Sequence, residues 1–194
     1  MIPSEFMYKR LMVTAIRENA NRRGIAFDSK SDDWIIELQR GNERHRMIGF
    51  RFDLNDSVAS QIAQDKVATH IMLAANNVPS VYHRLLRREL SVVDRNIMSE
   101  WGSTIVKPLT GSGGHDIRLF SDLDKLASFI GASVVHAWAA APLVPIENET
   151  RIILLDGEVL LSYEKEPIEI NGIKMFNLGL GGRAIYIESH PPNR

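Results

Sequence analysis

A lysine followed closely by a glycine-rich turn is the feature of this sequence best suited to chemistry. It lies in the run T-I-V-K-P-L-T-G-S-G-G-H-D-I-R-L-F, from Thr104 to Phe120. Gly111, Gly113 and Gly114 would let backbone N–H groups approach a phosphate without obstruction by a Cβ atom, and Lys107 would add a positive charge. The apolar runs on both sides predict strand, loop, strand, a hairpin whose loop lies over a bound anion. An ordinary hairpin with a structural glycine turn is the alternative.

Several familiar sites are excluded by spacing. A Walker loop has its lysine after the glycines and a helix next, and no strand-to-helix turn here carries G-x-G-x-x-G. The six histidines show no metal-ligand spacing, and the sequence around Ser112 lacks the full G-x-S-x-G spacing of a serine hydrolase. A phosphate bound here would therefore be held by a strand-loop-strand lid.

Composition narrows the class of protein. The chain has 194 residues, 44% of them hydrophobic and 24% charged, which suits one or two small packed units. A net charge of −1 speaks against a dedicated nucleic-acid binder, and the absence of cysteine excludes disulfides and thiolate sites. No apolar run reaches the roughly 18 residues of a membrane span, and no signal peptide is recognisable. A cytoplasmic protein with no nucleic-acid or membrane partner is expected.

Periodicity and turn residues predict the elements that position the lysine and its loop. Asp156-Gly157 lies between two β-rich runs, which is a strong hairpin signal. On pattern alone Lys66 falls in mid-helix and would be called a surface lysine. The expected elements are a helix over 4–23, an antiparallel pair over 34–38 and 47–52 joined by a polar turn over 39–46, a helix from Asp56 or Ser57 through Ala75, a loop or short strand within 80–90, a short helix over 94–101, a helix capped by Ser121, a strand over 134–138, and a hairpin over 150–155 and 158–163.

Four motifs, in order, resemble the ATP-grasp superfamily. They are V-A-S-Q-I-A-Q-D-K-V-A-T-H-I-M-L with N-V-P, T-I-V-K-P-L-T-G-S-G-G, E-T-R-I-I-L-L-D-G-E-V-L, and N-L-G-L-G-G-R-A. The likeness as a whole covers roughly residues 20–187. The closest likeness is to the ATP-grasp modules of cyanophycin synthetases and related carboxylate-amine ligases. The resemblance implies an α+β fold in which two α+β subdomains clasp ATP.

The resemblance also implies roles for individual residues. Lys66 and Lys107 would reach the ATP phosphates from two sides, under a mobile loop of Ser112, Gly113 and Gly114. Residues 134–138 would present backbone to the adenine edge, which assigns His136, Ala137 and Trp138 to the nucleotide, and Glu149 or a neighbour would approach the ribose. Arg151 and Lys165 would lie near the γ-phosphate and acyl-phosphate, and Asn177 at the phosphate or acceptor end. For His136, a packed core histidine is an equally open interpretation.

The implied reaction is ATP-dependent ligation of a carboxylate to an amine through an acyl-phosphate. Its substrates would be small-molecule or peptide carboxylates and amines, with ATP and Mg²⁺ as cofactors. Such phosphoryl transfer depends on positioning and on neutralisation of charge, for which two lysines, an arginine and a glycine loop are suited. A non-catalytic nucleotide-binding or interaction module is the alternative.

Two departures from the family pattern bear on that choice. His136 stands where an acidic residue is common, and the aspartate and E-x-N motif that hold Mg²⁺ are not found, so the metal ligands are unknown. The C-terminal subdomain is expected to be incomplete: a fragment, a chain completed by a partner, or a relic that does not catalyse. An uncovered sheet edge would favour a homo-oligomer or a partner chain. The expected division is 1–55, a reduced N-terminal segment; 56–133, with the lid; and 134–194, the partial C-terminal subdomain.

Overall fold

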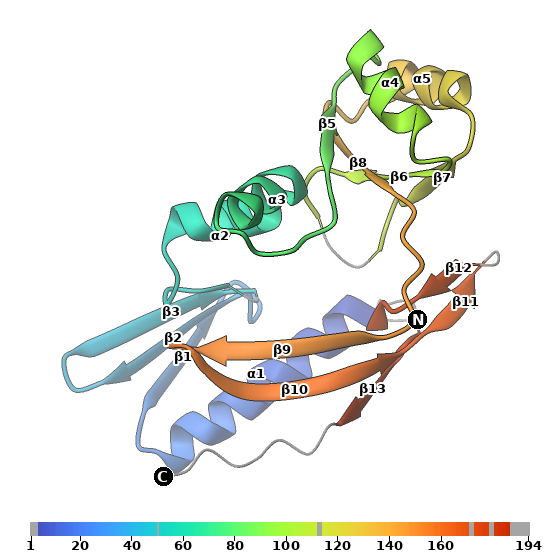
Figure 1. Cartoon of the computed structure of the whole chain (residues 1–194). Helices are drawn as coiled ribbons and strands as arrows, with labels where there is room; N and C mark the ends of the chain where they lie inside the picture. Colours follow the sequence, from blue (N-terminus) through green and yellow to red (C-terminus); the bar gives the residue numbers. More distant parts are fainter. Residues whose placement is uncertain (1–3, 50, 112–113, 171–172, 179–180, 187–194) are drawn as a thin grey trace. The chain divides into compact units, whose positions relative to one another are not determined.

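A computed structural model describes residues 4–49, 51–111, 114–170, 173–178 and 181–186 of the chain (Figure 1). The chain forms two compact units, Met1–Gln61 and Ile62–Arg194, with the boundary inside helix α2 (Ser57–Gln64). The finer division at residues 55 and 133 stays a prediction. None of the helices within the described ranges combines the length and apolar character that a membrane span requires.

The first unit is one helix with a four-stranded antiparallel sheet. Val13 of the helix is buried with Ile36 and Met47 of the sheet. The helix predicted over 4–23 and the antiparallel pairing of the two predicted runs are confirmed, but the run over 47–52 is divided between two strands, β3 and β4, and β1 was not predicted. The bounds are α1 Ser4–Arg22, β1 Ala26–Lys30, β2 Ile35–Arg40, β3 Glu43–Ile48 and β4 Arg51–Phe52, and the strands are ordered β1-β2-β3-β4.

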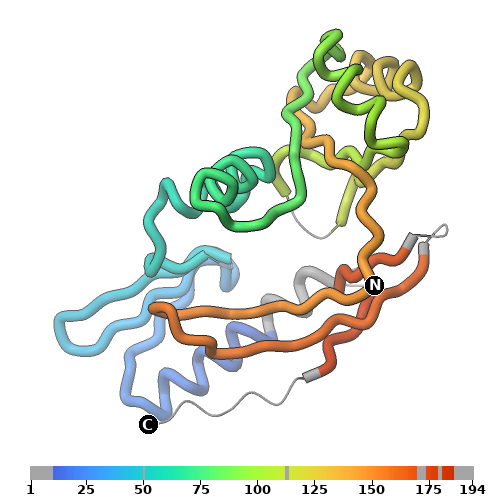
Figure 2. The backbone as a smooth tube through the Cα atoms, in the orientation of Figure 1, coloured from blue at the N-terminus to red at the C-terminus, as the bar shows by residue number. Residues whose placement is uncertain are grey.

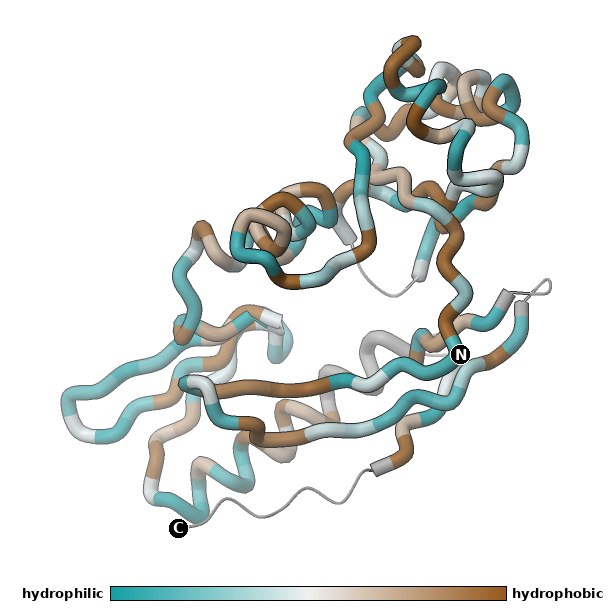
Figure 3. Tube along the Cα trace, viewed as in Figure 1, coloured by the Kyte–Doolittle hydropathy of each residue, from teal (hydrophilic) through white to brown (hydrophobic). Residues whose placement is uncertain are grey.

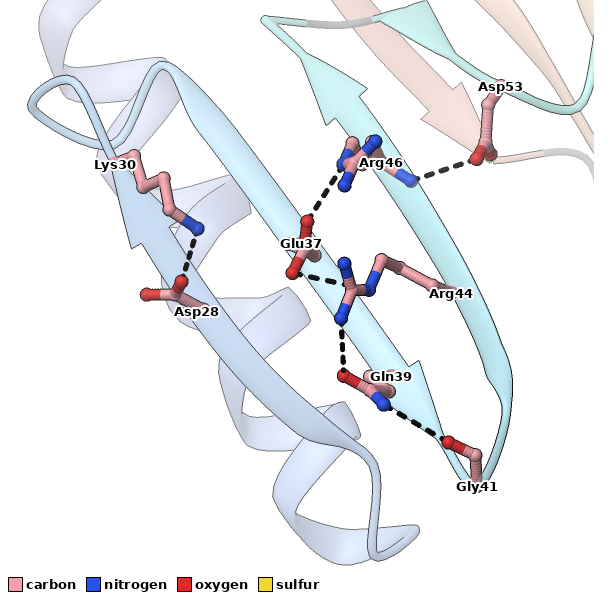
Figure 4. A network of polar contacts seen from close by, with 8 residues as sticks. All are labelled: Asp28, Lys30, Glu37, Gln39, Gly41, Arg44, Arg46 and Asp53. Carbon is pink, nitrogen blue, oxygen red and sulfur yellow. Dashed lines mark hydrogen bonds and ion pairs between the residues drawn. The ribbon is translucent and has the colours of Figure 1, made fainter.

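The prediction of a polar turn over 39–46 is wrong, because most of these residues belong to strands. Only Gly41 and Asn42 lie between β2 and β3. Glu37 faces the partner strand and forms ion pairs with Arg46 at 2.7 Å and Arg44 at 3.5 Å (Figure 4). Charged side chains thus cover a solvent-facing strand surface, which sequence pattern alone does not distinguish from a turn.

Two helices, of which the first crosses the boundary between the units, meet at a break. The predicted single helix is divided into α2 and α3 (Lys66–Ala75) at Asp65, whose extended backbone makes it the N-cap of α3. The Asp65 carboxylate accepts hydrogen bonds from the N–H groups of Val67 and Ala68. Lys66 is therefore the first residue of a helix, and its predicted mid-helix position is wrong.

A four-stranded antiparallel sheet holds the core of the second unit. Its core face carries Leu86, Val106 and Trp138, which pack against Met98 of α4 and Leu126 of α5. Both helices lie together on one side of the sheet (Figures 1 and 2). The strand order is β5-β8-β6-β7, and the bounds are β5 Arg84–Leu86, α4 Val92–Ser99, β6 Thr104–Pro108, β7 Arg118–Phe120, α5 Leu123–Ala132 and β8 Trp138–Pro142.

The hairpin of β6 and β7 confirms the predicted strand, loop, strand arrangement, while two local predictions fail. The strand predicted over 134–138 is wrong, because β8 begins at Trp138 and continues through three buried alanines, whose low β-propensity concealed it. Ser121 is not the cap of α5. Asp122 is, since its carboxylate accepts the N–H groups of Asp124 and Lys125.

Another sheet of the second unit is built from the predicted Asp-Gly hairpin. Asp156 and Gly157 both have positive φ, as a two-residue turn of this kind requires. Apolar side chains on both β9 and β10 are exposed, and β9 is largely brown in Figure 3. Self-association over this surface stays a prediction. The bounds are β9 Glu149–Leu155, β10 Glu158–Glu166 and β13 Arg183–Tyr186 in the order β13-β10-β9, with a separate pair β11 Ile168–Ile170 and β12 Ile173–Met175.

Candidate anion-binding site

Lys107 lies on the face of the β5-β8-β6-β7 sheet that is turned away from the core of that sheet. Val106 and Ala140, which pair across β6 and β8, belong to the core, so the neighbouring pair Lys107 and Ala139 falls on the opposite face. The lysine is half-buried. Its pKa is lowered mainly by burial, while the charge of Glu149 acts in the opposite direction. A desolvated ammonium group of this kind gains most from an anionic ligand.

Lys66 is tied to the backbone that follows Lys107. Its Nζ atom donates to the carbonyl oxygens of Pro108 at 2.9 Å, Gly111 at 3.2 Å and Leu109 at 3.4 Å, and its backbone N–H donates to Leu109 O. Burial lowers the pKa of Lys66, and the charge of Lys107 lowers it further. The two ammonium groups thus act on each other at the start of the glycine-rich loop.

The loop itself approaches the second glycine-rich segment. Gly114 has a φ of +80°, and a Cβ atom at this position would lie 2.9 Å from the Asn177 side chain. Asn177 is held in turn by its carbonyl oxygen, which accepts the N–H of Gly182. The predicted lid residues Ser112 and Gly113 lie outside the described residues. The backbone of Gly114 thus lies so close to Asn177 that position 114 has no room for a side chain, which explains the glycine.

Glu149 and Lys165 form an ion pair between β9 and β10. The two residues are directly opposite in the strand register, and Lys165 Nζ donates to Glu149 Oε1. Only 6% of the Lys165 side chain is exposed, against 39% for Glu149. Glu149 therefore compensates one buried lysine while its charge also acts on Lys107.

Solved structures share the fold of this chain. The ATP complex of D-alanine–D-alanine ligase from Bacillus anthracis matches 70% of this chain and 44% of its own, with a TM-score of 0.51 and 16% identity. Bifunctional glutathione synthetase from Pasteurella multocida matches 80% of this chain and 22% of its own, with a TM-score of 0.50 and 15% identity. This chain has an ATP-grasp fold.

Sequence comparison leads to the same group of ligases. Cyanophycin synthetases of Trichormus variabilis and of a Nostoc species are 29% identical over 163 residues, which is 81% of this chain. The chain spans 18% of the length of these curated relatives. No family model matches the sequence. The predicted ATP-grasp fold and its likeness to the cyanophycin synthetase module are confirmed.

Three residues assigned to the adenine edge of the ATP-grasp site are placed differently from expectation. His136 is exposed, lies outside any strand, and lines a surface pocket with Arg87, Arg88 and Glu89. Ala137 uses its carbonyl oxygen to accept the N–H of Leu109. Trp138 is buried in the core, so its side chain is committed to packing. Their assignment to the nucleotide stays a prediction.

Arg151 and the metal ligands are the remaining parts of the site that the sequence was used to predict. Arg151 is exposed on β9, two residues after Glu149, and pairs with Tyr163. Within the described ranges no group of three or more histidine, aspartate or glutamate residues is arranged to hold a metal ion. The Glu149 carboxylate is engaged by Lys165, so it does not fit a role as an Mg²⁺ ligand in this arrangement.

Two histidines near the lysines were not assigned from the sequence. His83 is half-buried, and its pKa is lowered by burial and by the charges of Lys107, His70 and Lys66. His70 lies one helical turn after Lys66 on α3. That i, i+4 spacing was the available signal, because the helix predicted through Ala75 already places both residues on one face.

Proposed function

We propose that this chain binds ATP through Lys66, Lys107 and the glycine-rich loop, as part of an ATP-dependent carboxylate-amine ligase. The observation that carries the proposal is the attachment of Lys66 to the carbonyl oxygens of Pro108 and Gly111, beside a half-buried Lys107. Two ammonium groups and an open glycine backbone in one place suit a triphosphate. The similarity to cyanophycin synthetases supports the ligase class.

The proposed reaction has two steps. A carboxylate oxygen attacks the γ-phosphorus and ADP leaves, which gives an acyl-phosphate; an amine then attacks the acyl carbon and inorganic phosphate leaves. Lys107 would offset negative charge as the phosphoryl group is transferred. Lys66 would hold the loop over the phosphates. Arg151, Lys165 and Asn177 are proposed at the transferring end, and Lys165 would act there with its charge partly balanced by Glu149.

A non-catalytic nucleotide-binding module is the second candidate. It is favoured by the pairing of Glu149 with Lys165, because the carboxylate whose charge acts on Lys107 is then engaged with a protein cation. This candidate requires ATP binding without turnover. ADP formation that depends on both a carboxylate and an amine would exclude it.

Calorimetric titration with a non-hydrolysable ATP analogue, with and without Mg²⁺, tests the binding proposal. We expect the wild type to bind and Lys107→Ala to bind at least about tenfold more weakly, which corresponds to the loss of one charge-assisted contact. Lys125→Ala is the matched control, because Lys125 is an exposed lysine on α5. Equal affinity of Lys107→Ala and wild type would overturn the proposal.

A further inference from the structure

Two histidines extend the lysine pair into a larger basic cluster. Lys66 and His70 lie one turn apart on α3, so they share a face of that helix. His83 precedes β5, and its ring lies 6.4 Å from the ring of His70. Lys107 lies on β6, next to the carbonyl groups that hold Lys66. Three separate segments thus contribute four basic side chains, and the charges of the other three act on His83.

One hydrogen bond fixes the tautomer of neutral His83. Its Nδ1 atom lies 2.8 Å from the carbonyl oxygen of Val81. Because a carbonyl oxygen can only accept, Nδ1 carries the proton in this contact. The second nitrogen, Nε2, therefore has a lone pair when the ring is neutral. His83 is held in an orientation in which Nε2 can gain a proton without loss of the Val81 contact.

The surroundings of His83 oppose its protonation while no anion is bound. Burial is the largest cause of its lowered pKa; the Val81 contact raises the pKa, and the charges of Lys107, His70 and Lys66 lower it. The titratable neighbours in its own segment are Tyr82, which packs edge-on against His70, and Arg84, which is paired with Asp94. The imidazole of His83 is therefore neutral near pH 7.

We propose that His83, with His70 beside it, is a further ligand of the anion held by Lys66 and Lys107, and that Nε2 of His83 takes up one proton from solvent when the anion binds. A bound polyphosphate would reverse the local field, since its negative charge outweighs the nearby lysines. Protonated Nε2 then becomes a donor to a phosphate oxygen. This inference rests on the proposed function, with the triphosphate of ATP as the anion.

Proton linkage fixes the sign of the pH dependence. The pKa of His83 is low in the free protein and higher in the complex, so binding and protonation favour each other. Between the two values, affinity falls as pH rises, by up to about tenfold per pH unit. Outside that window the contribution of His83 to the slope disappears.

The experiment measures proton uptake directly. A non-hydrolysable ATP analogue is titrated without Mg²⁺ into wild-type protein in buffers of different ionisation enthalpy, and tripolyphosphate is used in a second series. The same titrations use His83→Asn, whose side-chain amide can replace Nδ1 as a donor to Val81 but does not titrate. His45→Gln is the control, because His45 is an exposed histidine of β3. Histidine resonances in NMR spectra report each pKa and the folded state.

We expect net proton uptake by the wild type and by His45→Gln, and a smaller uptake by His83→Asn with either probe. Protonation of the probe itself is common to all three proteins, so their difference isolates His83. Analogue binding with equal uptake in all three would overturn the inference but leave the proposed function intact. Tripolyphosphate binding with His83-dependent uptake, without nucleotide binding, would support the anion site and overturn the ATP proposal. Failure of both probes to bind would overturn both.

Discussion

The ammonium group of Lys66 lies 2.9 Å from the carbonyl oxygen of Pro108, a residue 42 positions further along the chain. Pro108 directly follows Lys107, so this contact joins the start of α3 to the strand that carries the second lysine. A hydrogen bond from a charged donor is stronger than one from a neutral donor. The ammonium group of Lys66 donates to three carbonyl oxygens. The position of one lysine therefore depends on the other.

Lys66→Met is expected to weaken both the loop attachment and nucleotide binding. Loss of charge-assisted hydrogen bonds should lower the free energy of unfolding by about 1–2 kcal/mol, and nucleotide affinity should fall at least about tenfold. Denaturant unfolding and calorimetry measure the two effects. Lys125→Met provides the control, and a variant with unchanged affinity would contradict the assigned role.

Lys107→Met should separate stability from binding. Burial lowers the pKa of Lys107, so the unfolded chain binds this proton more tightly and the charged lysine costs folding free energy. The nucleotide-free variant is therefore expected to melt at a higher temperature than wild type at neutral pH, and to have lost nucleotide binding. In wild type, the stability contribution of Lys107 rises with pH between its lowered pKa and 10.5. A less stable variant would contradict this account.

The Glu149–Lys165 pair predicts an asymmetry between its two truncations. Glu149→Gln leaves a lysine whose side chain is only 6% exposed without its counter-charge, and should cost about 2–3 kcal/mol of stability. Lys165→Met leaves a carboxylate that is more accessible to water, and should cost less. Urea unfolding of both variants provides the comparison, and the reverse order would show that Lys165 is stabilised by other groups.

Asp94 is expected to be important for the stability of the second unit. It completes a capping box with Ser91 at the start of α4 and pairs with Arg84 of β5 at 2.6 Å. Asp94→Ala should cost about 2–3 kcal/mol, and Asp124→Ala, which removes a highly exposed carboxylate, much less. Burial raises the pKa of Asp94, but the Ser91 and Arg84 contacts outweigh it and lower the pKa. This stability should therefore be lost as pH falls through the lowered pKa, measurable by acid unfolding.

Gly114→Ala should be more harmful than Gly111→Ala. Both glycines have positive φ, which costs an alanine about 1 kcal/mol. Only at Gly114 would the added Cβ meet another side chain, that of Asn177. The double variant Gly114→Ala/Asn177→Ala should recover the additional loss, with a coupling free energy of about 1 kcal/mol in thermal or urea unfolding. Strict additivity would argue against the contact.

Local patterns predicted the fold well where each element carries its own turn or cap. The Asp156-Gly157 hairpin and the helix over 4–23 are examples, because residue types that favour positive φ and helical periodicity can both be recognised in a sequence. The strand starting at Trp138 was misplaced, since alanines buried by neighbouring strands resemble a helix or a loop. Tertiary packing decides such segments.

The candidate site was predicted through its lysines and glycines, and its histidines were missed. Lys107 is recognisable beside the glycine turn, but the position of Lys66 depends on the helix break at Asp65, which periodicity did not reveal. His83 has no local motif, and its relation to His70 and Lys107 arises from residues far apart in sequence. Such juxtapositions become visible only in the folded chain.

The close approach of Gly114 to Asn177 also constrains how this sequence can change over time. Any residue with a Cβ atom at position 114 would meet the amide of Asn177, so the first substitution tolerated should be at position 177. Descendants of this sequence should therefore acquire a small residue at 177 before they acquire a side chain at 114. The two positions would then covary across a family tree, although 63 residues separate them in sequence.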